Sequence, residues 1–330
     1  MMLEFPGPIG ERPLHLVELP PPLPGPGQVL LEVKYCGVCR WDLHLVEGEV
    51  ALERLPIIPG HQMVGVVADV GPGVKRLKVG DRVGLGWLAN SCGYCEYCDA
   101  GQEQLCEAAE FTGLHQDGGL AEVVAAHEDF VHLLPEGVGW ETAAVLVGAG
   151  ALAYRALRRC GLKSFERVGL YGFGTAAQVA LLVAKEWDCW VAVFSRRSGH
   201  RRWAKEVGAD WVGQVQDNLP TRLDRAVIFA PSGRLLPMAL AAVRRGGAVV
   251  LAASSVKQVP AMDYERHLAY EKTLQVVSGC GRQELREFLK LAARMQLTPR
   301  VEVRPLEEAN EVLAQLKAGT LRGAGVLAIK

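Results

Sequence analysis

Four cysteines crowded into one short segment constrain this chain more than any other feature. Their spacing is C-x2-C-x2-C-x7-C, at Cys92, Cys95, Cys98 and Cys106. The segment has no apolar periodicity, so it has no core-facing side with which to fold by itself. Four thiolates in one loop complete the tetrahedral shell of a zinc ion, whereas disulfide frameworks belong to small secreted chains. We therefore predict a structural zinc loop, which is closed to substrate because protein sulfur fills every position.

Length, composition and charge narrow the class of protein. The 330 residues suggest about two domains, and 49% hydrophobic with 22% charged residues is typical of a globular chain. The formal net charge is -1, so we expect no nucleic-acid or membrane-surface partner. No segment is apolar for long enough to cross a bilayer, and the first residues lack the pattern of a signal peptide. Clustered thiols fit a reducing compartment, so we expect a cytoplasmic protein.

Short strand patterns and glycine turns fill the first half of the chain. Apolar and polar residues partly alternate over 28–36, and 64–70 is an apolar run. Further strand patterns begin at residue 80 and at residue 120. Few helical patterns occur between them, so we expect a β-rich domain.

A strand, a glycine turn, a helix and a second strand follow one another over 168–194. The turn and the start of the helix are formed by Gly172, Phe173, Gly174, Thr175, Ala176 and Ala177. This is the dinucleotide-binding arrangement: the first glycine permits the turn, the second admits the pyrophosphate, and the small third residue keeps the helix close to the sheet. The pyrophosphate would lie at the helix N-terminus, where free N–H groups favour anions. A structural glycine turn without a ligand is the alternative, which the two flanking strands make weaker.

The end of the second strand indicates which dinucleotide is used. It reads Ser195-Arg196-Arg197, with Arg201 and Arg202 beyond. NAD sites carry a carboxylate here for the ribose 2′-hydroxyl, and none is present. Guanidinium groups match a phosphate with two hydrogen bonds, so we predict NADP(H) in preference to NAD(H). The alternative is a solvated basic turn that accepts either cofactor.

Strand and helix patterns continue to alternate through the second half. Strands are predicted over 226–229, 248–253 and 273–277, with helices over 200–207 and 235–244. Repeated units of this kind build a parallel sheet with helices on both faces, a doubly wound Rossmann-type domain. The fold class is therefore α/β, with a β-rich domain beside it.

The order of motifs carries a resemblance to a known family. The chain contains Gly37-Val38-Cys39, Pro59-Gly60-His61, Gly80-Asp81-Arg82-Val83, the four-cysteine loop, Thr112-Gly113 and Asp117-Gly118-Gly119. This order resembles the zinc-containing alcohol dehydrogenases of the medium-chain dehydrogenase/reductase superfamily, over nearly the whole chain. The resemblance implies a GroES-like catalytic domain of residues 1–148 and 281–330 around an inserted Rossmann domain, 149–280. It also implies a catalytic cleft between the domains, a small-molecule substrate, and a homodimer or homotetramer.

The same resemblance assigns catalytic residues. In the family a second zinc is held by a cysteine, a histidine and a later cysteine, and Cys39 and His61 match the first two. Asp42 matches the carboxylate that orients the histidine ligand. His44 matches the histidine that passes the alcohol proton to solvent, and Trp87 matches an aromatic residue of the substrate pocket. A further match, Arg282, implies a contact with the cofactor pyrophosphate.

Three positions depart from the family pattern. The third zinc ligand falls on Gly148, which has no side chain. The glutamate that follows the histidine ligand is replaced by Gln62, whose carbonyl brings no charge. The hydroxyl residue that first accepts the substrate proton is replaced by Trp41, whose indole cannot accept it and narrows the pocket.

Three functions therefore stay open. The first is a zinc-dependent NADP(H) oxidoreductase that interconverts alcohols with aldehydes or ketones, with zinc on Cys39, His61 and either Gln62 or water. The second is a carbonyl or enone reductase with only the structural zinc, which uses His44 or Tyr154 as a hydrogen-bond donor. The third is a dinucleotide-binding protein that has lost catalysis and acts as a sensor or partner subunit. The three departures favour the second and third, whereas the intact relay residues and cofactor turn favour the first.

Overall fold

The computed structural model describes residues 1–253 and 255–329, and it divides the chain into two compact units. Unit 1 is Met1–Ala151 with Gly279–Lys330, and unit 2 is Leu152–Ser278. The domain borders expected from the sequence, at 148 and 281, lie three and two residues from these borders. Among the described residues, no helix is both long and apolar enough to cross a membrane.

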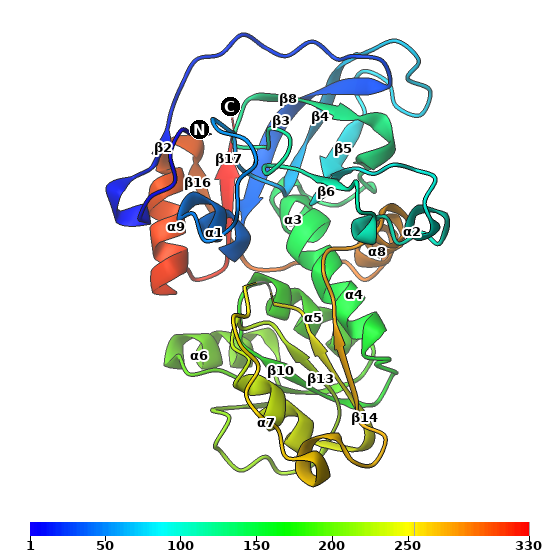
Figure 1. The fold of residues 1–330 in the computed structure, drawn as a ribbon, viewed down its shortest axis with the longest axis vertical. Coiled ribbons are helices and arrows are strands. Elements are labelled where there is room, and N and C mark those ends of the chain that lie inside the picture. The colour runs from blue at the N-terminus through cyan, green and yellow to red at the C-terminus, as the bar shows by residue number, and fades with distance from the viewer. Residues whose placement is uncertain (254, 330) are drawn as a thin grey trace. The chain divides into compact units, whose positions relative to one another are not determined.

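Unit 1 is built on a seven-stranded sheet in the order β16-β17-β3-β4-β5-β9, with β8 also paired to β3 (Figure 1). The strands are β3 (Gln28–Val38), β4 (Met63–Val70), β5 (Arg82–Leu85), β8 (Val123–His127), β9 (Val131–Leu133), β16 (Val301–Pro305) and β17 (Ala324–Ala328). All pairs are antiparallel except β16 with β17. Alternate residues of β3, namely Val29, Leu31 and Val33, are buried in the core, as a half-buried strand requires. The expected β-rich domain is confirmed.

Shorter elements of unit 1 surround this sheet. They are the strands β1 (Met2–Leu3), β2 (Leu14–His15), β6 (Leu88–Asn90) and β7 (Glu110–Phe111), the helices α1 (Arg40–Val46), α2 (Glu96–Asp99), α3 (Trp140–Val145), α8 (Arg282–Arg294) and α9 (Ala309–Ala318), and the 3-10 turns η1 (Ile9–Glu11), η2 (Glu103–Leu105), η3 (Glu128–Phe130) and η6 (Leu306–Glu308). A π-helical segment, η4 (Leu146–Gly150), joins α3 to α4 (Ala151–Arg159). Segments of this kind are rare and often lie at functional sites.

Unit 2 is built on a six-stranded parallel sheet in the order β12-β11-β10-β13-β14-β15 (Figure 1). The strands are β10 (Arg167–Tyr171), β11 (Trp190–Phe194), β12 (Trp211–Gly213), β13 (Leu223–Ile228), β14 (Val243–Leu251) and β15 (Thr273–Val276). The other elements are α4, which lies in unit 2 from Leu152 onward, α5 (Thr175–Glu186), α6 (Ser198–Val207), α7 (Leu235–Ala242) and the π-helical η5 (Tyr264–Leu268). Central strands such as β10 and β11 are almost continuously apolar because helices cover both faces of the sheet.

The connections of unit 2 confirm the doubly wound arrangement. From β10 the chain moves to β11 and β12 through α5 and α6, whereas β13 leads to β14 through α7 in the opposite direction. Right-handed crossovers then place α5 and α6 on one face of the sheet and α7 on the other. The direction of winding reverses between β10 and β13, and ligands of such sheets bind beyond the carboxyl ends of the strands at this reversal.

Candidate functional site

The four cysteines of the predicted zinc loop meet in unit 1. Their Sγ atoms lie within 4.8 Å of one another, and the Sγ atoms of Cys92 and Cys98 are 3.9 Å apart. A tetrahedral zinc with four sulfur ligands separates them by about 3.8 Å, so this donor set fits the ion. A hydrogen bond from the backbone N–H of Tyr94 lowers the pKa of the Cys92 thiol to about 7. The backbone N–H of Cys98 lowers the pKa of Cys95, but burial and the neighbouring thiols outweigh it and raise this pKa to about 11, so metal binding has to displace protons from the cluster.

Strand pairing brings the second group of candidate ligands together. In the antiparallel pair β3 with β4, Cys36 lies opposite Met63, so the segment that follows β3 meets the segment that precedes β4. Cys39 and His61 stand on these two segments, with 3.6 Å between Cys39 Sγ and His61 Nε2. Asp42 enters from the first turn of α1, where one of its carboxylate oxygens accepts the backbone N–H of Cys39 at 2.8 Å.

Asp42 also fixes the ring of His61. The Asp42 Oδ1 atom is 3.0 Å from His61 Nδ1, and both side chains are buried. Burial lowers the pKa of His61, but the charge of the Asp42 carboxylate and the Cys39 sulfur outweigh it and raise this pKa to about 10. With Nδ1 held by the carboxylate, Nε2 is the ring atom directed at Cys39. A tetrahedral zinc places a sulfur and a nitrogen ligand about 3.6 Å apart, so these two donors fit two of its positions.

No side chain at position 148 completes this set. A Cβ atom placed on Gly148 would lie 2.2 Å from Cγ and 2.4 Å from Oε1 of Gln62, closer than real Cβ contacts come. Gln62 Oε1 accepts the backbone N–H of Ala149 at 2.8 Å, and Gln62 Nε2 lies 3.5 Å from the carbonyl oxygen of Gly37. The amide of Gln62 thus fills the space that a ligand at position 148 would use, and the fit to a catalytic zinc is incomplete.

Aromatic rings lie against the Cys39–His61 pair. The Trp41 and Trp87 rings meet edge to face with centroids 4.8 Å apart, and Trp87 meets the His61 ring at 5.2 Å. Phe111 stacks on the other side of Trp87 at 4.7 Å. The structure therefore brings both predicted pocket residues to the candidate site, and it adds a third ring.

His44 lies on α1 and has one ring nitrogen without a partner. Its Nδ1 atom is 2.5 Å from the carboxylate of Glu49, whereas its Nε2 atom is buried and has no hydrogen-bond partner among the described residues. The His44 side chain is 10% exposed, whereas that of Glu49 is 41% exposed. A buried imidazole that contacts a more exposed carboxylate can pass a proton outward, the role expected of His44.

In unit 2 the glycine turn has the geometry that a dinucleotide needs. Gly172 has φ of 88°, and a Cβ there would meet Ala230 at 2.8 Å, so only glycine fits. A Cβ on Gly174 would meet no atom within 4 Å, and no side chain caps the N-terminus of α5, which starts at Thr175 and Ala176. Ala177 is fully buried, as close packing of the helix on the sheet requires. The N-terminus of α5 is thus left uncapped beside an open glycine, the arrangement that helix N-termini offer to an anion.

The basic turn follows β11. Ser195 is buried, whereas Arg196 and Arg197 are exposed. The Arg201 guanidinium donates to the carbonyl oxygens of Ser195 and Arg196 at 2.7 and 3.0 Å, which holds the turn in shape. The residues 195–198 that follow β11 include no carboxylate, so this turn itself carries positive charge. The Asp217 carboxylate, from the segment beyond β12, lies beside Gly213, whose carbonyl oxygen accepts the Ser195 N–H at 2.9 Å.

Arg282, the expected pyrophosphate contact, begins α8 in unit 1. Its Nε atom donates to Glu103 at 2.9 Å, and its guanidinium lies over the Phe130 ring at 4.8 Å. The side chain is therefore held by unit 1 itself. Its role at the pyrophosphate stays a prediction.

Comparison with known proteins decides the family. An alcohol dehydrogenase GroES-like domain matches residues 25–136. A probable alcohol dehydrogenase, AdhA, of Mycobacterium tuberculosis is 38% identical over 98% of this chain and 95% of its own length. An alcohol dehydrogenase of Geobacillus stearothermophilus is 37% identical over 97% of both chains. The chain belongs to the zinc-containing alcohol dehydrogenases of the medium-chain dehydrogenase/reductase superfamily.

The fold agrees with this assignment. The cobalt- and zinc-bound thermostable alcohol dehydrogenase from Pyrobaculum aerophilum has a TM-score of 0.89 to this structure at 26% identity, covering 99% of this chain and 98% of its own. The resemblance inferred from the motif order is thus confirmed, together with the GroES-like and Rossmann-type fold. The chain is an alcohol dehydrogenase-like oxidoreductase that uses a nicotinamide dinucleotide.

Three features of the site escaped prediction from the sequence of this alcohol dehydrogenase-like protein. Phe111 comes directly before the Thr112-Gly113 motif, and the pairing of β6 with β7 brings it to Trp87. Glu49 lies just beyond α1, five residues after His44, a spacing that a helical pattern does not mark. The third feature is the packing of the Gln62 side chain beside Gly148. Both positions depart from the family pattern, so the sequence marked each of them as unusual, but it did not show that they are in contact.

Proposed function

We propose that this chain catalyses hydride transfer between NADP(H) and a small alcohol, aldehyde or ketone. The observation that carries the proposal is the Cys39–His61–Asp42 group, with a half-buried thiol and a buried imidazole and carboxylate, beside aromatic rings in a chain that also has an open glycine turn. A protein that only bound a dinucleotide would have no use for an imidazole oriented by a buried carboxylate. The cofactor supplies the hydride chemistry, and the protein supplies position and electrostatics.

The residues around the substrate would divide the work. Asp42 holds the His61 ring, which fixes the position of its second nitrogen. Trp41, Trp87 and Phe111 would exclude water and select a substrate by shape. His44 would take up or release the alcohol proton, with Glu49 leading it toward solvent.

A catalytic zinc, if bound, would be held by Cys39 and His61 with Gln62 or water, and it would polarise the substrate oxygen as a Lewis acid. The second candidate is reduction of a carbonyl or enone without metal at this position. It is favoured by one observation, the Gln62 amide that fills the space beside Gly148. His44 and Tyr154 are the donors that the sequence suggested for this case.

Zinc per chain distinguishes the two candidates. It would be measured by elemental mass spectrometry on protein purified without chelator or added metal. Two zinc ions per chain would support the zinc-dependent alcohol dehydrogenase, and alcohols and aldehydes would be screened next. One zinc ion would leave only the four-cysteine loop filled and would favour the metal-free reductase.

The choice of NADP(H) over NAD(H) is supported by the basic turn after β11. A 2′-phosphate would lie near Ser195, Arg196 and Arg197, and the turn itself offers it two exposed guanidinium groups and no carboxylate. We expect kcat/KM to be at least about tenfold higher with NADP(H) than with NAD(H), since a charge-assisted bidentate pair contributes on this order.

Paired variants test this preference. The double substitution Arg196→Gln with Arg197→Gln should lower the NADP/NAD ratio of kcat/KM about tenfold. Arg159→Gln, on an exposed arginine of α4 away from the turn, should leave the ratio unchanged. A wild-type preference below about tenfold, or a ratio that the double variant does not move, would contradict the assignment.

We also propose an oligomeric state and a cellular location for this chain. The strand β15 is an edge of its sheet, and Val276 on it is 68% exposed. An exposed apolar edge strand is a ready surface for a second copy, which supports a homodimer or a homotetramer built from it. The clustered thiols support a cytoplasmic location, because metal-bound cysteines persist in a reducing compartment.

A further inference from the structure

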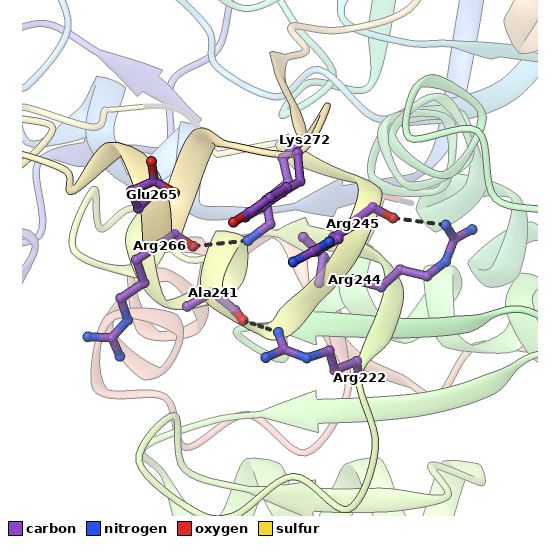
Figure 2. Close-up of a pocket in the computed structure, with 9 residues that line it drawn as sticks. Arg222, Ala241, Arg244, Arg245, Glu265, Arg266 and Lys272 are labelled. Carbon is purple, nitrogen blue, oxygen red and sulfur yellow. Dashed lines mark hydrogen bonds between the residues drawn. The ribbon is translucent and has the colours of Figure 1, made fainter.

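A basic pocket of about 690 Å³ lies in unit 2 at the amino ends of β13, β14 and β15 (Figure 2). Its charged lining residues are Arg222, Arg244, Arg245, Glu265, Arg266 and Lys272. In a parallel sheet all strands point the same way, so the amino ends form the edge opposite to the carboxyl ends. The dinucleotide turn follows the carboxyl end of β10, and this pocket is therefore separate from it.

Most of the positive charge in the pocket is not neutralised by the protein. Arg244 is paired, because its Nε atom donates to Asp224 at 2.6 Å. Among the residues that the structure describes, no carboxylate forms an ion pair with Arg222, Arg245 or Arg266. One carboxylate, that of Glu265, stands among the five cationic groups that line the pocket.

Contacts other than ion pairs hold three of these cations in place. The Arg245 guanidinium lies 3.8 Å from the centroid of the Tyr270 ring. Figure 2 shows the dashed contacts of the other two: the Arg222 guanidinium donates to the carbonyl oxygen of Ala241 at 3.1 Å, and the Lys272 ammonium donates to that of Arg266 at 3.0 Å. The Lys272 ammonium also donates to the carbonyl oxygen of Leu240 at 2.7 Å. Carbonyl groups and a ring orient these side chains without cancelling their charge, and each guanidinium keeps further N–H donors.

The pKa of Lys272 reflects burial and the excess of positive charge in the pocket. Burial and then the charge of Arg222 lower the pKa of Lys272. A neighbouring cation disfavours the charged ammonium, so a bound anion would relieve that repulsion. The same anion would meet donors that are already positioned, which reduces the entropy lost on binding.

We propose that this pocket binds a compact anion of the polyphosphate class, with two or more linked phosphate groups. Guanidinium forks match phosphate oxygens with two hydrogen bonds, and several cations without carboxylate partners require more than one phosphate to satisfy them. The volume of about 690 Å³ is also larger than a single phosphate needs. The proposal does not depend on the reaction that the enzyme catalyses.

The test is a calorimetric titration of the full-length protein with inorganic tripolyphosphate. NADPH is kept at saturation so that the dinucleotide turn is filled, and ionic strength is held constant with sodium chloride. We expect saturable binding that is at least about tenfold tighter than that of inorganic phosphate, because contacts to several phosphates add. The double variant Arg222→Gln with Arg245→Gln should weaken binding about tenfold or more.

Two further variants make the result decisive. Arg159→Gln removes an exposed arginine outside the pocket and should bind tripolyphosphate as the parent does. If the double variant does not fold, the single variant Arg245→Gln replaces it, because its guanidinium lies on the surface and contacts one ring. Absence of saturable binding, equal affinity for phosphate and tripolyphosphate, or a double variant with unchanged affinity would overturn the proposal. So would binding that appears only when NADPH is left out, since that would place the anion at the dinucleotide turn.

Discussion

Unit 1 contains two groups of side chains that could hold a metal ion, and they differ in how the chain builds them. The four-cysteine loop takes every ligand from one segment, Cys92 to Cys106. The other group takes Cys39 from the segment after β3 and His61 from the segment before β4, while position 148, where the family pattern places a third ligand, lies in η4. The local set is complete and the dispersed set is not. When one loop supplies every ligand, the residue spacing in that loop is enough to bring the ligands together. When three segments supply them, each segment must carry its own ligand and must also be packed in the right place.

Side-chain packing fills the space at position 148, where the family pattern places the third ligand. Gln62 occupies the space beside Gly148 and binds the backbone of Ala149. Trp41 fills further space against Trp87. We therefore expect that placing a cysteine at position 148 alone does not complete a metal site, because the Gln62 side chain occupies the space that its thiol needs.

The largest effect is expected for the complete set. Cys98→Ser should remove the structural zinc and lower the free energy of unfolding by about 3 kcal/mol, because the segment has no core-facing side without the metal. The thermal midpoint would then fall by about 4 °C, measured by calorimetry together with zinc content. Cofactor affinity should hardly change. Tyr94→Phe, at an exposed position of the same loop, is the control, and a Cys98→Ser protein with unchanged zinc content would refute a four-sulfur site.

A smaller effect is expected for the incomplete set. Gly148→Cys should destabilise the protein by about 1 to 3 kcal/mol without adding zinc, because its Cβ would lie 2.2 Å from Gln62. Adding Gln62→Ala should recover much of that loss and allow a second zinc per chain. Chemical denaturation and elemental analysis of both single variants and the double variant would measure the coupling. A second zinc in the Gly148→Cys single variant would show that Gln62 does not obstruct the site.

The smallest effect is expected for the carboxylate behind His61. Asp42→Asn keeps the side-chain shape but removes the charge 3.0 Å from His61 Nδ1, and kcat/KM should fall about tenfold. Steady-state kinetics with NADPH and an aldehyde would measure this fall. Asp69→Asn, at an exposed position on β4, should leave kcat/KM unchanged. Equal rates for Asp42→Asn and the parent would mean that the ring of His61 is not part of the reaction.

The parts of the molecule that could be predicted were those in which neighbours in sequence are neighbours in space. The spacing of Cys92 to Cys106 brought four sulfurs to one place because a short loop cannot separate them. The glycines of the dinucleotide turn were identified because the turn, the helix start and both strands lie within one stretch of about thirty residues. Apolar periodicity separated the β-rich unit from the parallel sheet, since each kind of sheet buries a different pattern of residues.

Contacts between distant segments were decided only by the tertiary structure. The sequence marked Gln62 and Gly148 as unusual, but only the packing of the His61 loop on η4 shows that one side chain fills the space of the other. Phe111 reached Trp87 through the pairing of two short strands. The basic pocket joins Arg222 to Lys272 because parallel strands far apart in sequence begin at one edge of a sheet. Side-chain direction and volume are properties of the packed chain, and residue spacing along the sequence does not contain them.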